Sequence, residues 1–166
     1  MHFTATLRDF LTRVAEVDPV AVSYEALTGA FLSGPYSNSP WRHEGGVLPD
    51  VGPHVVSAFT ALLGPVVDAT SDSHRGVARL ELTHESGALS HALLSAHYTG
   101  PAVRSLRAFT EDGVIAADLT LPDPDLWGEV RRAFADTVRT GTPHLLDVHR
   151  AVELQRVLAL AMRGAR

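Results

Sequence analysis

One segment of the sequence places a carboxylate and an imidazole where they could act together. In the stretch 45–54, GGVLPDVGPH, a glycine pair precedes a predicted helix, and Asp50 and His54 lie four residues apart. Residues at this spacing share one helix face, so both side chains can enter one cleft. The carboxylate could orient the ring, and the imidazole could then take a proton from a substrate hydroxyl or carbon acid near neutral pH. The plainer interpretation is that Asp50 caps the helix and His54 binds backbone, since aspartate is a favoured N-cap residue.

A second group of candidate residues lies just before this segment, within 33–46. Tyr36, Trp41, Arg42 and His43 interrupt a stretch that is otherwise rich in Ser, Pro, Gly and Asn. They could bind a hydroxylated or anionic substrate through ring stacking and the planar guanidinium group. A loop that is merely held to the domain by its aromatic residues would have the same composition.

The composition excludes several kinds of mechanism. All 14 basic residues are arginine, which removes lysine Schiff bases, ammonium acids and phosphate-loop lysines. Cysteine is absent, so disulfides, thiolate nucleophiles and cysteine-bound zinc are excluded. The nine histidines form no H-E-x-x-H motif or similarly tight cluster, and we predict no metal site. A net charge of −5 with scattered arginines argues against nucleic acid as a partner.

The spacing of apolar residues predicts the elements that position the candidate residues. A helix is expected within 1–17, on the apolar side chains Phe3, Leu7, Phe10, Leu11 and Val14. A long half-buried strand should follow over 20–32, and a helix over about 50–63 should end at Gly64-Pro65.

The second half of the chain predicts further strands and two closing helices. Short apolar runs between 66 and 122 are separated by turn residues, and 85–87 and 111–113 are typical of tight hairpins, so we expect an antiparallel meander. After Asp123-Pro124 a helix should bury Leu126, Trp127, Val130, Phe134 and Val138, and Asp147 should cap the last helix. We expect the apolar stripes of the helices to lie in the core.

These elements indicate one α+β domain over 1–166, with a mainly antiparallel open β-sheet and helices packed on one face. The regions are a leading helix within 1–17, a sheet over 20–122 with the inserted helix, and two closing helices over 123–166. Charged residues interrupt the first segment and no long apolar run follows, so we expect a soluble cytoplasmic protein without a signal peptide or membrane span.

The motif GGxxxDxxxH, at Gly45 to His54, resembles the signature by which oxidoreductases of the Gfo/Idh/MocA family place a catalytic Asp and His. The flanking segment 30–56 and the closing segment 141–166 resemble the same family's carboxy-terminal domain. This resemblance implies the fold of that domain, similar to the carboxy-terminal domains of dihydrodipicolinate reductase and GAPDH. It also implies catalytic roles for Asp50 and His54.

Two features depart from the family pattern. A second Asp often follows the His by three residues, but Ser57 stands there. The family's nucleotide-binding Rossmann domain, with its glycine-rich loop and catalytic lysine, has no counterpart, because the chain lacks both a G-x-G-x-x-G motif and lysine. We therefore expect this chain to bind no cofactor alone, and NAD(P) only when a separate nucleotide-binding domain is supplied.

Three functional hypotheses remain open. The chain could supply the substrate pocket and the Asp50/His54 pair to a dehydrogenase whose Rossmann domain is a separate partner. It could be a cofactor-independent isomerase, lyase or cyclase acting on a small oxygenated molecule, for example one of secondary metabolism. It could also be a non-catalytic binding or oligomerisation module. Under each hypothesis we expect a homo-oligomer, at least a dimer, formed through an apolar sheet face.

Overall fold

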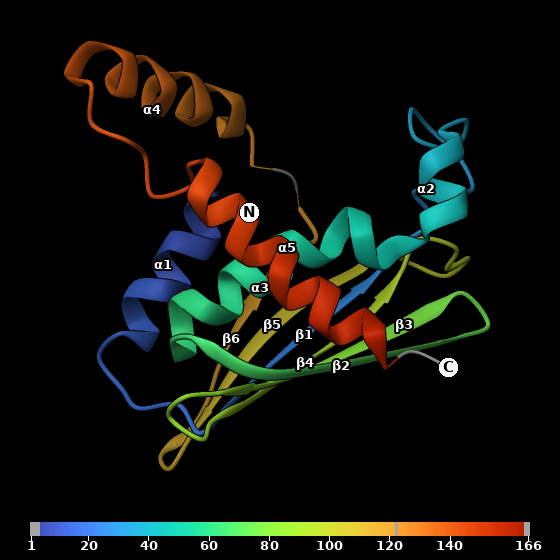
Figure 1. The fold of residues 1–166 in the computed structure, drawn as a ribbon, viewed down its shortest axis with the longest axis horizontal. Helices are drawn as coiled ribbons and strands as arrows, with labels where there is room; N and C mark the ends of the chain where they lie inside the picture. Colours follow the sequence, from blue (N-terminus) through green and yellow to red (C-terminus); the bar gives the residue numbers. More distant parts are fainter. Residues whose placement is uncertain (1–3, 122, 165–166) are drawn as a thin grey trace.

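The computed structural model describes residues 4–121 and 123–164, so Phe3 of the predicted first helix and position 122 of the predicted sheet region lie outside it. The described chain forms helices and strands of one α+β fold (Figure 1). In chain order they are α1 (Ala5–Val14), β1 (Ala21–Leu27), α2 (Pro40–Gly45), α3 (Val47–Leu63), β2 (Val66–His74), β3 (Val77–His84), β4 (Leu89–Ser95), β5 (Val103–Thr110), β6 (Gly113–Asp118), α4 (Leu126–Thr140) and α5 (Val148–Arg163).

The strands form one six-stranded sheet in the order β2-β3-β4-β1-β5-β6. The predicted hairpins join β3 to β4 and β5 to β6, and all strand pairs except one are antiparallel. The exception is β1, which enters the middle of the sheet and pairs in parallel with β4. The expected meander is therefore split into two parts by the first strand of the chain. The predicted open, mainly antiparallel sheet is confirmed.

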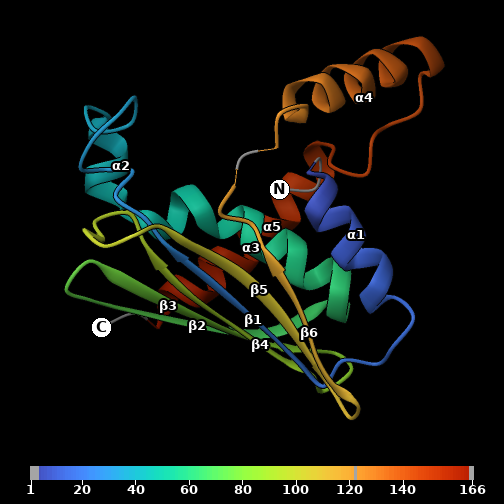
Figure 2. The same ribbon diagram turned by 180° about the vertical axis from the view of Figure 1, so that it is seen from behind.

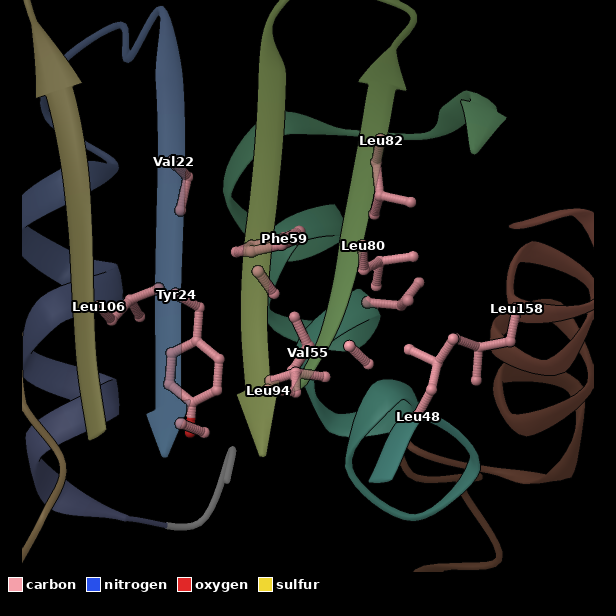
Figure 3. Close-up of a cluster of buried hydrophobic side chains, with 14 of the residues drawn as sticks. Val22, Tyr24, Leu48, Val55, Phe59, Leu80, Leu82, Leu94, Leu106 and Leu158 are labelled. Carbon is pink, nitrogen blue, oxygen red and sulfur yellow. The ribbon is translucent and has the colours of Figure 1, made fainter. Parts of the chain in front are cut away.

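The helices α1, α3 and α5 cover one face of this sheet (Figures 1 and 2). Apolar side chains of α3, such as Val55 and Phe59, point onto sheet residues that include Leu80 and Leu94 (Figure 3). All four are fully buried. Helix α5 lies beside α3, where its Leu158 meets Leu48 of α3. The layer of helices therefore fixes where α3, and with it the candidate pair, sits.

Two predicted elements differ from those observed. The strand expected over 20–32 ends at Leu27, because the chain turns at Gly29, whose carbonyl accepts hydrogen bonds from the backbone N–H groups of Leu32 and Ser33. The loop expected over 33–46 contains the short helix α2, with Pro40 at its start. Proline favours the first turn of a helix because its fixed φ is already helical.

The expectation that all apolar helix stripes lie in the core is wrong for α4. None of the residues of α4 is buried, and Trp127, Phe134 and Val138 are 69%, 70% and 68% exposed. Figures 1 and 2 both show α4 standing apart from the sheet and its covering helices. In α5, by contrast, Leu154 and Leu158 are buried, although Val148 and Val152 are exposed. Helix α4 is amphipathic, but no part of the described chain buries its apolar stripe.

The other face of the sheet carries charged and apolar side chains together. On this face Arg79 pairs with Asp72 and with Glu81, and Arg107 pairs with Glu25. Leu89, Leu93 and Val114 are the exposed large apolar residues of strands β4 and β6. The uncovered face is thus less apolar than we expected. Among the described residues, none of the helices is long and apolar enough to cross a membrane.

Candidate active site

Helix α3 carries Asp50 and His54 one turn apart, as predicted, but it begins earlier than expected. Gly46, with φ of 77°, precedes its first residue, Val47. A backbone in this left-handed region favours glycine, which accounts for one of the two glycines of the motif. Asp50 is consequently the fourth residue of the helix and does not occupy the N-cap position. The simple capping role for Asp50 therefore does not hold.

The carboxylate of Asp50 is held by Arg42. The Nε–H of Arg42 donates to Asp50 Oδ2 at 3.2 Å, and both side chains are largely shielded, 21% and 24% exposed. The same guanidinium lies over the rings of Tyr36 and Trp41, 4.6 and 4.3 Å from their centroids. It also donates from Nη1 to Ser39 Oγ at 3.1 Å. The structure thus brings together four of the predicted site residues, and we call Tyr36, Trp41, Arg42 and Asp50 the arginine clamp.

His43, the remaining candidate of the α2 region, is turned away from this clamp. Its Nε2–H donates to the backbone carbonyl of Ser37 at 2.7 Å. Its ring packs near the rings of Phe31 and His97, with centroids 5.6 and 6.1 Å away. These contacts fasten the segment before α2 to the end of β4. His43 therefore serves this segment as a structural contact.

His54 opens into a cavity of about 490 Å³ that lies between α3, the start of α4 and the start of α5. The lining includes the hydroxyl-bearing Ser57, the aromatic Trp127 and two charged residues of the last segment, Asp147 and Arg150. Sites for small molecules commonly have volumes of about 300–1,000 Å³. The volume of this cavity lies within that range, and it is large enough for a molecule the size of a monosaccharide.

The two charged residues at the α5 end of the cavity are fixed by local bonds. Asp147 is the predicted cap of α5, and its Oδ1 accepts from the backbone N–H of Arg150 at 2.9 Å. Arg150 donates from Nη1 to Glu153 at 3.0 Å and from Nη2 to Thr60 Oγ1. Sequence reasoning missed Arg150 as a cavity residue. Its only signal was its place three residues after the capping aspartate.

The protonation of His54 depends on its surroundings. Although its side chain is exposed at the cavity wall, the surrounding protein displaces enough water to lower the pKa of His54 below its ordinary value. The negative charge of Asp50 opposes this effect and raises the pKa. Asp50 and His54 share no hydrogen bond among the described residues, so the carboxylate acts on the ring through space. Near neutral pH the ring is thus largely uncharged and able to accept a proton.

The chain resembles known proteins in its fold more than in its sequence. Neither a protein-family model nor a curated protein matches it. Among solved structures, a probable dehydrogenase from Thermotoga maritima matches 98% of this chain with a TM-score of 0.81 and 17% sequence identity. The predicted resemblance is confirmed at the level of the fold. A myo-inositol dehydrogenase from Corynebacterium glutamicum also matches 98% of the chain, with a TM-score of 0.78 and 17% identity.

A third similar structure is GenD2 from gentamicin A biosynthesis, solved in complex with NAD. It matches 98% of this chain with a TM-score of 0.80 and 17% identity. This chain spans only 58–60% of the length of these three proteins. It therefore has the fold of part of such an oxidoreductase, and roughly 100 residues of each, about one domain, have no counterpart here.

Proposed function

We propose that this chain is the substrate-binding and proton-transfer part of an oxidoreductase of the Gfo/Idh/MocA type. The observation that carries this proposal is that His54 faces a ligand-sized cavity from a helix of the shared fold. The names of the similar proteins include a myo-inositol and a D-galactose dehydrogenase. A small polyhydroxylated molecule is accordingly the substrate class that we propose.

In this proposal His54 is the general base. Its neutral ring takes the proton from a substrate hydroxyl, and the through-space charge of Asp50 stabilises the imidazolium that forms. Arg42 keeps the carboxylate in place. Ser57 and Arg150 line the same cavity and are positioned to hydrogen-bond other oxygen atoms of the substrate. The pKa of His54 is lowered, so the base form persists to mildly acidic pH.

The described residues do not fit a nicotinamide dinucleotide. A dinucleotide site needs a parallel strand that leads into a glycine-rich turn and a helix whose N-terminus meets the pyrophosphate. Here the glycine pair lies at the end of α2 rather than after a strand, and the one parallel pair among the described strands, β1 with β4, leads into no such helix. We therefore propose that any NAD(P) is held by a separate nucleotide-binding domain, and we derive no redox step for this chain.

A cofactor-independent reaction is the second candidate, and one observation favours it. The proposed base, His54, and two groups that could bind substrate oxygen atoms, Ser57 and Arg150, line one cavity of this chain. Proton removal and return, as in an isomerase or lyase, would then need no second domain. Solvent exchange of a substrate C–H hydrogen would follow from this chemistry.

A calorimetric titration of the purified chain tests the proposed function. The probes are myo-inositol, D-galactose and, separately, NAD(H) and NADP(H), with His54→Gln as the site variant and His91→Gln, on the uncovered sheet face, as its matched control. We expect one polyol to bind, His54→Gln to weaken it at least about tenfold, or 1.4 kcal/mol, and neither dinucleotide to bind. Equal binding to both variants would overturn the role of His54, and tight dinucleotide binding would overturn our view of the cofactor.

The two candidate reactions are separated by an incubation of chain and polyol in D₂O without any nucleotide. NMR follows whether deuterium enters a C–H position of the polyol. Uptake with the wild-type chain, but not with His54→Gln, would establish the cofactor-independent reaction. Binding of the polyol without deuterium uptake would support the first candidate, in which a separate domain supplies NAD(P).

A further inference from the structure

Helix α4 presents a continuous apolar stripe that its own chain leaves uncovered. Trp127, Val130, Phe134 and Val138 follow one another at helical spacing, and no residue of α4 is buried. Val148, the first residue of α5, is 69% exposed and lines the same cavity as Val130 and Phe134, so it extends the apolar region. An isolated helix of this length is only marginally stable in water, so most of its stability must come from packing of its apolar face. Something outside the described residues must cover this stripe.

The polar side of α4 does not need that cover. Arg132 pairs with Asp125 and with Glu129, and Arg139 pairs with Asp136, all within or at the start of the helix. Near its start α4 is bonded to α1: Arg8 of α1 pairs with Glu129 at 3.4 Å, and the backbone N–H of Ala5 donates to Asp123 just before α4. Four of the charged residues of α4, Glu129, Arg132, Asp136 and Arg139, are thus already paired, and the surface the helix lacks is an apolar one.

An apolar groove lies directly beside the stripe. A cavity of about 580 Å³ separates α4 from the segment leading to α5, and its walls include Phe134, Leu146 and Val148. Phe134 is 70% exposed at the edge of this groove. The same patch therefore offers both a protruding aromatic ring and a hollow that could receive one. Self-complementarity of this kind is what a two-fold symmetric interface requires.

The apolar area of the patch is a large part of what a dimer interface needs. Four large apolar side chains, Trp127, Phe134, Val138 and Val148, are between 68% and 70% exposed. At about 100–170 Å² each they present roughly 500 Å² of apolar surface, well over half of the roughly 800 Å² that one partner buries in a standard interface. The uncovered sheet face, in comparison, places ion pairs among its exposed apolar residues.

We propose that the α4 patch is the dimer interface of this chain, with a second copy as its occupant. The two α4 helices pack against each other across a two-fold axis, and Phe134 of each copy enters the groove beside α4 of the other. Trp127 and Val130 also line the cavity that contains His54. The partner's α4 therefore closes the outer side of that cavity, and the dimer completes the candidate active site. The oligomer predicted from the sequence is thereby assigned to α4 rather than to the sheet.

The mass of the protein in solution, measured by light scattering across a concentration series, tests this proposal without substrate or nucleotide, so its outcome is independent of the proposed function. The variant is Phe134→Glu, which keeps a good helix former in α4. The matched control is Leu89→Glu, which places the same charge at a 57% exposed residue of the sheet face. We expect wild type and Leu89→Glu to have twice the chain mass of 17.8 kDa and Phe134→Glu to have the chain mass, with unchanged circular dichroism.

Fluorescence gives a second readout of the same interface. The chain has two tryptophans, so Trp41→Phe leaves Trp127 as the only reporter. We expect its emission to shift to the blue as the protein concentration rises, and this shift to vanish when Phe134→Glu is added. A wild-type monomer at 100 µM, or a dimer that Leu89→Glu dissociates while Phe134→Glu does not, would overturn the proposal. If the wild-type protein were a monomer, a different protein, such as a nucleotide-binding domain, would be the partner that covers the patch.

Discussion

Gly52 lets α5 approach α3 between the two residues of the candidate pair. A Cβ atom at this position would lie 2.8 Å from Leu158 Cδ2 and 3.2 Å from Leu48 Cδ1. Both leucines are buried, so neither side chain can turn out into solvent, and each must shift within the core to make room. Overpacking a filled core costs about 1–3 kcal/mol, whereas an unstrained Gly→Ala change inside a helix contributes about 1 kcal/mol of stability. We therefore expect Gly52→Ala to lower the free energy of unfolding by about 1 kcal/mol.

Urea unfolding followed by circular dichroism, at one fixed protein concentration, measures this change. Leu158→Ala by itself should cost about 2–5 kcal/mol, but it also opens the space that the added methyl group at position 52 needs. In that background Gly52→Ala should instead stabilise the protein by about 1 kcal/mol. Gly164→Ala, just after α5, is the control, because its φ of −93° suits any residue and an added Cβ there would meet no atom within 4 Å. If Gly52→Ala were stabilising with Leu158 intact, the close approach of the two helices would be wrong.

Two further predictions concern titration. In an NMR titration of the histidine ring protons, Asp50→Asn should lower the pKa of His54 further, because the carboxylate is the group that raises it; an unchanged pKa would contradict the through-space coupling. Burial also lowers the pKa of His84, whose ring bonds the Gly64 carbonyl and Ser90 Oγ, both at 2.8 Å. The unfolded chain protonates this histidine near pH 6.5, so its contribution to stability is complete above about pH 6.5 and is lost as the pH falls towards the lowered pKa. In unfolding curves measured at pH 7.5 and 5.5, the free energy of unfolding should therefore fall less between the two pH values for His84→Gln than for wild type.

The elements with strong local signals could be predicted from the sequence. Asp147 before an apolar stripe gave the cap of α5, and Gly87 and Gly113 marked the two hairpins. The position of β1 could not be predicted in this way, because pairing between β1 and β4 joins residues far apart in the chain. Its burial on both faces, with Val22, Ser23 and Tyr24 all buried, is a consequence of that central position. Local periodicity contains no information about which distant strand will be the neighbour.

The α4 stripe shows a different limit of sequence reasoning. Its apolar spacing correctly predicted an amphipathic helix, since Trp127, Phe134 and Val138 share one face. The same spacing cannot say whether that face packs within the chain or against another molecule, because both solutions remove the same side chains from water. Only the exposed fractions distinguish the two. The structure shows that this face is not buried within the described chain.

The arginine clamp shows why the spacing of Asp50 and His54 predicted only part of the candidate site. The i, i+4 pattern suggested a carboxylate that orients the ring. In the structure the carboxylate accepts a hydrogen bond from Arg42 at 3.2 Å, and the guanidinium of Arg42 lies over the rings of Tyr36 and Trp41. An opposite charge this close offsets part of the field that Asp50 exerts on His54. The segment before α3, and not the helix alone, therefore determines how strongly the carboxylate supports a protonated ring.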